Sequence, residues 1–122
     1  MDDSVLKIAM RCADLAASKQ FYGSVLGLEL VDDWEESHGN GCIYAMGAGL
    51  LELNERKTAD RSPHEPVDRF DLQLRIPDLG SWINRIDGRW DHSGVKEHPW
   101  GERTVRMRDP DGVLVTLYEK IQ

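Results

Sequence analysis

An internal repeat constrains the fold of this 122-residue chain more than any other feature of its sequence. Residues 8–15, IAMRCADL, match residues 72–79, LQLRIPDL, position for position at an offset of 64. The same offset aligns residues 51–55, LELNE, with residues 115–119, VTLYE. Two separate matches at one offset require intervening segments of equal length, which chance rarely produces. The sequence therefore predicts two copies of one structural module.

Each copy has the pattern of a strand, a helix and three further strands. Asp14 is a typical helix N-cap, and the apolar stripe with helical spacing that follows it ends at Gly27. Asp78 and Gly88 hold the corresponding places in the second copy. The later strands are predicted at residues 28–36, 41–46 and 49–55, and at 94–98, 102–108 and 113–119. This order predicts an α+β fold made of two βαβββ modules.

The length of the chain suits one domain with a sizeable core. We expect a single domain over residues 1–122, with module one at about 4–55, a polar linker at 56–67 that contains Pro63 and Pro66, and module two at about 68–120. No apolar run approaches the roughly 18 to 20 residues that a membrane span needs. The acidic start, MDDS, is unlike a signal peptide, so we expect a cytoplasmic protein.

Charge and cysteine content narrow the possible partners. The formal net charge of -7 argues against binding to nucleic acids or to an anionic membrane surface, because both attract basic proteins. Cys12 and Cys42 lie in apolar segments with strand character, which is typical of small buried thiols and not of a catalytic cysteine.

Several motifs, taken in order, resemble one superfamily. They are FYGSVLGL at residues 21–28, PWGER at 99–103, DPDG at 109–112 and a strand that ends in Glu119. Together they resemble the glyoxalase/bleomycin-resistance/extradiol dioxygenase superfamily, also called vicinal oxygen chelate, over Val5 to Glu119. The resemblance implies two modules whose curled mixed sheets form a cup with the helices outside, in a homodimer. Members range from glyoxalase I to drug-binding resistance proteins, so the fold alone does not decide the function.

Strand alternation predicts which side chains line the cup. In each copy one face of the sheet is apolar and covers the helix, and the opposite face is largely polar. The predicted ligand-binding residues on the polar faces are Lys7, Glu52, Asn54, Asp71, Gln73, Thr116 and Tyr118. We add Trp34 and Tyr44, which either stack on a planar ligand or pack in the core, and Arg103 as a clamp for an anion.

The resemblance also implies where a metal would bind. Enzymes of the superfamily mostly hold a divalent ion with His or Glu residues, and the four positions correspond here to Lys7, Glu52, Asp71 and Thr116. Only Glu52 is the usual type of ligand, so a metal, if present, is held by Glu52 and Asp71. The ammonium of Lys7 has no free lone pair. A divalent ion about 4 Å from it meets a repulsion of roughly 8 kcal/mol at an effective dielectric constant of 20. We therefore predict no metal and no other cofactor.

The four histidines, at positions 38, 64, 92 and 98, lie in predicted loops or near strand ends. None forms a pair with metal-ligand spacing on one element, and we expect each to be exposed.

The sequence thus favours a metal-independent binding protein that resembles the bleomycin-resistance type and sequesters a small planar molecule in the cup between the modules. The alternative is an enzyme, a glyoxalase-like lyase or isomerase or a dioxygenase, with a displaced or partial metal site. A ligand-sensing subunit is a third class that the sequence neither supports nor excludes. No catalytic residue is assigned.

Overall fold

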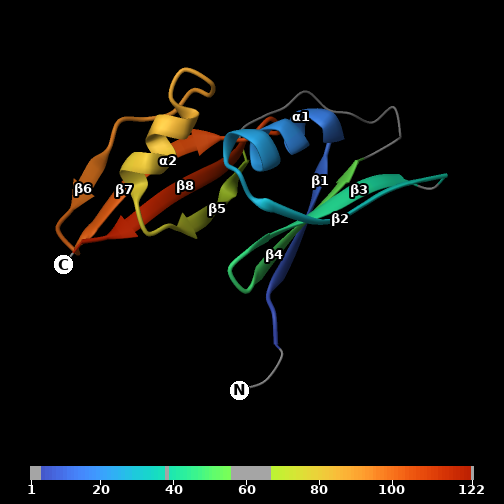
Figure 1. Cartoon of the computed structure of the whole chain (residues 1–122), viewed down its shortest axis with the longest axis horizontal. Helices are drawn as coiled ribbons and strands as arrows, with labels where there is room; N and C mark the ends of the chain where they lie inside the picture. Colours follow the sequence, from blue (N-terminus) through green and yellow to red (C-terminus); the bar gives the residue numbers. More distant parts are fainter. Residues whose placement is uncertain (1–3, 38, 56–66, 122) are drawn as a thin grey trace. The chain divides into compact units, whose positions relative to one another are not determined.

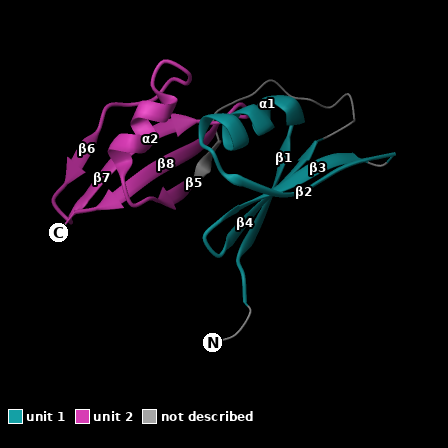
Figure 2. Cartoon of the chain, in the orientation of Figure 1, with its two compact units in different colours: residues 1–63 teal, residues 64–122 magenta. Residues whose placement is uncertain are grey.

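A computed structural model of the chain describes residues 4–37, 39–55 and 67–121. The chain divides into two compact units, residues 1–63 and 64–122 (Figure 2). Most of the predicted linker, residues 56–66, lies outside the described residues. Its last residue, Val67, already belongs to the first strand of the second unit.

Unit 1 contains one mixed sheet and one helical segment (Figure 1). Its elements are β1 (Lys7–Cys12), α1 (Leu15–Lys19), the π-helix η1 (Gln20–Val25), β2 (Glu29–Glu36), β3 (Gly39–Met46) and β4 (Gly49–Glu55). The strand order is β1-β4-β3-β2, with β1 parallel to β4 and the other pairs antiparallel. We call this sheet A.

Unit 2 repeats this topology. Its elements are β5 (Val67–Arg75), α2 (Leu79–Ile86), β6 (Lys96–His98), β7 (Glu102–Arg108) and β8 (Val113–Lys120). The order β5-β8-β7-β6 again places the first strand parallel to the last. We call this sheet B. The two βαβββ modules are confirmed, and each sheet is a separate open sheet of four strands.

The ends of the helices follow the predicted capping pattern. The side-chain oxygen of Asp14 accepts a hydrogen bond from the Ala17 amide at 3.2 Å, and Asp78 accepts one from Ser81 at 3.4 Å. Gly27 and Gly88 follow the helices with φ angles of 79° and 77°, which side chains other than glycine rarely adopt.

The first helical segment differs from the regular helix that its apolar stripe predicts. It widens into η1, where the Leu26 amide donates to the carbonyl oxygen of Phe21 at 2.9 Å, five residues back. Phe21 and the adjacent Tyr22 are both fully buried. The widened segment therefore accommodates two neighbouring large aromatic side chains in the core of unit 1.

A second interaction at the start of each helix joins it to the end of a strand. The Leu15 amide donates to the Glu55 carboxylate at 2.7 Å, and the Leu79 amide donates to Glu119 at 3.2 Å. Both pairs are related by the 64-residue offset. Because the first amides of a helix have no partner within it, these glutamates satisfy donors that the fold leaves open.

The core of each unit lies between its sheet and its helix. Cys12 and Cys42 are buried free thiols, as predicted. Burial raises the pKa of Cys42 to about 11, so this thiol is protonated at neutral pH.

Candidate ligand-binding faces

Each sheet has a far face, which we define as the face opposite the helix of its own unit. Strand register places these side chains on the far face of sheet A: Lys7, Ala9, Arg11, Asp32, Trp34, Glu36, Gly41, Ile43, Ala45, Leu50, Glu52 and Asn54. The far face of sheet B carries Asp71, Gln73, Arg75, Lys96, His98, Glu102, Thr104, Arg106, Arg108, Leu114, Thr116, Tyr118 and Lys120. The seven residues predicted from strand alternation all lie on these faces, and their role in binding stays a prediction.

On the far face of sheet A, Glu52 is held by two donors. The Nζ atom of Lys7 donates to Oε1 at 3.0 Å, and Nδ2 of Asn54 donates to Oε2 at 2.9 Å. The hydrogen bond from Asn54 and then the contact with Lys7 lower the pKa of Glu52 below its usual value. Glu52 is therefore an ionised carboxylate at neutral pH, with both oxygens engaged.

On the far face of sheet B, Asp71 is held in the same way. Oγ1 of Thr116 donates to Oδ1 at 2.7 Å, and Nε2 of Gln73 donates to Oδ2 at 2.9 Å. Thr116 is fully buried. Each unit thus combines one carboxylate, one donor on the neighbouring strand and one carboxamide two residues along the carboxylate's own strand.

Trp34, one of the two aromatic residues added to the predicted ligand-binding set, lies on the far face of sheet A. It pairs with Gly41, which in turn pairs with Asn54. A Cβ atom at position 41 would overlap the indole ring of Trp34 and lie 2.7 Å from the carbonyl oxygen of Leu53. The glycine therefore lets the half-buried indole lie against the backbone of the sheet.

Two residues of the predicted ligand-binding set lie on the helix faces instead. Tyr44 pairs with Leu51 and is buried; its hydroxyl donates to the carbonyl oxygen of Lys19 at 3.4 Å, and burial raises its pKa to about 12. Arg103 donates to Glu97 at 3.0 Å and to Glu119 at 3.4 Å. Both side chains lie on the face opposite the polar clusters, so neither acts together with them.

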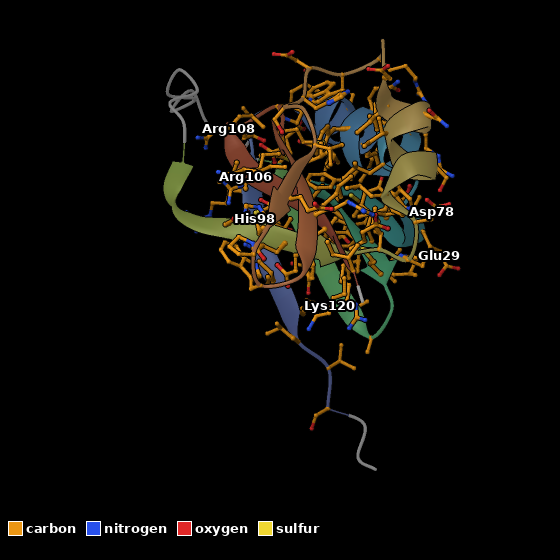
Figure 3. All side chains as sticks on the ribbon, turned by 90° about the vertical axis from the view of Figure 1, so that its left-hand side faces the viewer. Glu29, Asp78, His98, Arg106, Arg108 and Lys120 are labelled. Carbon is orange, nitrogen blue, oxygen red and sulfur yellow. The ribbon has the colours of Figure 1, made fainter. Side chains whose placement is uncertain are left out.

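Sequence reasoning missed the cationic far-face side chains of β6, β7 and β8. The far face of sheet B carries Arg75, Lys96, Arg106, Arg108 and Lys120 against the carboxylates Asp71 and Glu102. Figure 3 shows Arg106, Arg108 and His98 on the opposite side of unit 2 from Asp78, the N-cap of α2. Residues 102–108 alternate between buried side chains, such as Val105 and Met107, and exposed ones, and this alternation would have found Arg106 and Arg108.

Two hollows are lined by these cations. The larger, which we call the arginine hollow, has a volume of about 580 Å³. It is lined by Trp90, Asp91, His92, Ser93, Arg106, Met107, Arg108, Asp109 and Leu114. A smaller hollow of about 290 Å³ is lined by Arg75, Ile76, Pro77 and Lys120. Both lie within unit 2.

The histidines depart in part from the expected exposure. His98 is buried. Its Nε2 atom lies 2.8 Å from Oγ1 of Thr104, and its ring stacks on Trp100 with centroids 4.4 Å apart. The exposed Trp100 therefore shields this ring from water. His92 is half-buried, with Nε2 3.0 Å from Asp87 and Nδ1 2.7 Å from the carbonyl oxygen of Ser93. His38 and His64 lie outside the described residues.

The residues at the four implied metal positions do not fit a divalent ion. Within each unit they supply one carboxylate, together with the Lys7 ammonium in unit 1 and the Thr116 hydroxyl in unit 2. All four carboxylate oxygens already accept hydrogen bonds. Across the described part of the chain, no three His, Cys, Asp or Glu side chains gather as metal ligands.

Comparison with known proteins identifies the family. The model of the Glyoxalase/Bleomycin resistance protein/Dioxygenase superfamily matches residues 4–117. The chain belongs to this superfamily, and its two modules have the vicinal oxygen chelate fold. No curated protein matches the chain. Among the described residues, no helix is long and apolar enough to cross a membrane.

Solved structures of similar chains include an antibiotic binding protein and a lyase. TnmS3, an antibiotic binding protein from Streptomyces sp. CB03234, is 26% identical with a TM-score of 0.75, over 96% of this chain and 95% of that chain. A glyoxalase/bleomycin resistance protein from the same organism is 27% identical with a TM-score of 0.70, over 93% and 96%. A lactoylglutathione lyase from Agrobacterium tumefaciens is 24% identical with a TM-score of 0.70, over 95% and 92%, a likeness that shows the fold alone.

Proposed function

We propose that this protein binds and sequesters a small organic molecule without a metal, in the manner of bleomycin-resistance-type proteins, and that the ligand contacts the far faces of the sheets. The observation that carries the proposal is the state of the two carboxylates. Glu52 and Asp71 stand at implied metal positions, yet each already accepts a hydrogen bond at both oxygens.

Charge supports the same conclusion for unit 1. The Lys7 ammonium lies 3.0 Å from Glu52, close to where a cation bound to that carboxylate would lie. A divalent ion there would have to displace Lys7 or bear its repulsion. The pair itself adds little to stability, because the Lys7 side chain is 47% exposed and exposed ion pairs contribute about 0 to 1 kcal/mol.

The far faces have the properties of ligand-binding surfaces. They combine hydrogen-bonding groups with flat apolar area, including the indole of Trp34 and the ring of Tyr118. Planar ligands stack on such rings. The similarity to an antibiotic binding protein, TnmS3, points in the same direction.

Metal content of the purified protein tests the proposal. Protein purified without chelators is expected to contain far less than one equivalent of Zn, Ni, Fe, Mn or Co by elemental mass spectrometry. Lys7→His serves as the matched variant, since it removes the ammonium and adds an imidazole beside Glu52; it is expected to take up more metal than the wild type. Near-stoichiometric metal in the wild type, abolished by Glu52→Ala, would overturn the proposal.

Ligand capture and turnover provide a second test. Native mass spectrometry of protein taken directly from cell extract is expected to show a bound small molecule that denaturation releases. The protein is expected to leave catechols and the hemithioacetal of methylglyoxal and glutathione unchanged, with or without added divalent metal. Turnover of either substrate would overturn the proposed binding function and make the protein a glyoxalase-like lyase or a dioxygenase.

The proposal also includes a homodimer that works in the cytoplasm. The two buried free cysteines suit a reducing compartment. Light scattering coupled to size-exclusion chromatography is expected to give twice the chain mass of 13.9 kDa, and a monomeric mass would remove the dimer from the proposal.

A further inference from the structure

We infer that the ligand is a planar aromatic anion, and that Arg106 binds its acidic group in the arginine hollow. This inference rests on the proposed binding function and adds the chemical class of the ligand. It concerns unit 2 alone.

The far face of sheet B is cationic although the chain carries a net charge of -7. Two carboxylates lie on this face among the side chains that the structure describes, and both have other partners: Asp71 accepts from Thr116 and Gln73, and Glu102 accepts from the indole N–H of Trp100 at 3.0 Å. Among the residues that the structure describes, the Arg106 side chain makes no ion pair and no hydrogen bond. Its positive charge is therefore open to a ligand.

The backbone holds Arg106 in a fixed position. Its amide donates to Oγ of Ser93 at 2.9 Å, and its carbonyl oxygen accepts from the Ser93 amide at 2.8 Å. The exposed guanidinium thus extends from an anchored strand position next to Thr116, its register partner on β8. A guanidinium binds planar oxyanions through two parallel hydrogen bonds, which favours a carboxylate or a similar group.

The other charged side chains that line the hollow are Arg108, Asp109 and Asp91, and the first two accept or donate hydrogen bonds within unit 2. Arg108 donates to the carbonyl oxygen of Gly112 at 3.1 Å. Asp109 is buried, and its Oδ1 atom accepts from the amides of Asp111 and Val113, both at 2.8 Å, within the turn. Asp91 is exposed at the rim. Arg106 is therefore the anchor, and Arg108 adds a second positive charge nearby.

The walls of the hollow suit an aromatic body. The indole N–H of Trp90 donates to the carbonyl oxygen of Arg108 at 2.8 Å, which fixes the ring at the edge of β7, and Leu114 adds apolar surface. The volume of about 580 Å³ falls within the range of about 300 to 1,000 Å³ typical of small-molecule sites. A long polyanion is disfavoured, since the negative chain as a whole repels it.

Two fluorescent probes that differ by one sulfonate group test the inference. The anionic probe is 8-anilinonaphthalene-1-sulfonate, and the neutral probe is N-phenyl-1-naphthylamine, which lacks the sulfonate. Affinities are measured by fluorescence titration for the wild type, for Arg106→Gln and for the matched control Arg85→Gln. Arg85 is an exposed arginine of α2, so its replacement makes the same change in net charge away from the far face. Thermal unfolding verifies that all three proteins are folded.

The wild type is expected to bind the anionic probe more tightly than the neutral one. Arg106→Gln is expected to weaken binding of the anionic probe by about tenfold, because it removes a charge-assisted pair of hydrogen bonds. The affinity for the neutral probe is expected to stay unchanged. Arg85→Gln is expected to change neither. If Arg106→Gln leaves the anionic probe unaffected, or weakens both probes equally, the inference fails and the binding function stands. If neither probe binds the wild type, the proposed binding function fails with it.

Discussion

The two units share their structural contacts and differ in the chemistry of their far faces. The helix caps Asp14 and Asp78 occupy equivalent positions, as do Glu55 and Glu119, which accept the first helix amides. At the far-face positions the copies diverge: Lys7 corresponds to Asp71, and Glu52 to Thr116. The residues that bond the helix amides are thus the same in both units, while these far-face residues differ.

The divergence extends to charge and shape. Asp32 and Glu36 add acid to the far face of sheet A, whereas arginines and lysines dominate that of sheet B. Gly41, under the indole of Trp34, corresponds in register to Thr104, which contacts His98. One module therefore presents a flat aromatic surface and the other a cationic one. The comparison teaches that the fold places few demands on these positions.

The largest expected effect concerns the backbone contact that is specific to unit 1. Gly41→Ala is expected to destabilise the protein by about 1 to 3 kcal/mol, because the new methyl group meets both Trp34 and the immobile carbonyl oxygen of Leu53. Gly39→Ala, on the same strand, has open space around the new methyl group and is the control. Urea denaturation measures both, and equal stabilities for the two variants would show that the close packing under Trp34 is unimportant.

The contacts common to both units come next. Glu55→Ala and Glu119→Ala are each expected to lower the free energy of unfolding by about 1 to 2 kcal/mol, because each leaves a helix amide without its acceptor. The effect is expected to be larger for Glu55, whose hydrogen bond is shorter. Glu35→Ala, at an exposed position of β2, is expected to stay within about 0.5 kcal/mol. Chemical denaturation checks the order, and a neutral result for both glutamates would refute their shared role.

The far-face carboxylates distinguish the units more finely. Thr116→Val is expected to cost about 1 kcal/mol, because it removes a buried donor and leaves one oxygen of Asp71 without its partner. Lys7→Met is expected to cost less than about 0.5 kcal/mol, since the Lys7–Glu52 pair is largely solvated. Thermal unfolding of both variants at one pH tests the difference. A larger loss of stability for Lys7→Met than for Thr116→Val would show that the Lys7–Glu52 contact, and not the Thr116–Asp71 contact, contributes more to stability.

The smallest effect depends on pH and lies in unit 2. The carbonyl oxygen of Ser93, with a further contribution from Asp87, raises the pKa of His92 above the ordinary value of 6.5. The protonated ring therefore contributes its full stability below about pH 6.5, and that contribution is lost as pH rises through the folded-state pKa. His92→Gln is expected to flatten this part of the stability profile by a few tenths of a kcal/mol. An NMR titration that gave His92 an unshifted pKa would contradict this expectation.

Part of the candidate site was predictable because it depends on simple alternation. The strands at both ends of each module have a clear apolar face, so Glu52, Asp71 and Thr116 were placed correctly from parity. Strand β3 was harder, because residues 42–46, CIYAM, are apolar or small on both faces, so alternation left Tyr44 open between stacking on a ligand and packing in the core. For Arg103 the residue type suggested an anion clamp, and the register places it beside Glu119 on the helix face.

The amino-acid sequence alone encodes the modular topology, the caps that begin the helices and the glycines that follow them. It also encodes the polar far faces of the first and last strands of each module. These features are encoded locally or by the repeat offset, so no knowledge of distant contacts is needed. Tertiary structure decided which partners each polar group has. Glu55 and Glu119 reach amides 40 residues away, and the cations of β7 and β8 meet only when the sheet forms. Such contacts depend on strand order and register, which bring together residues that are far apart in the chain.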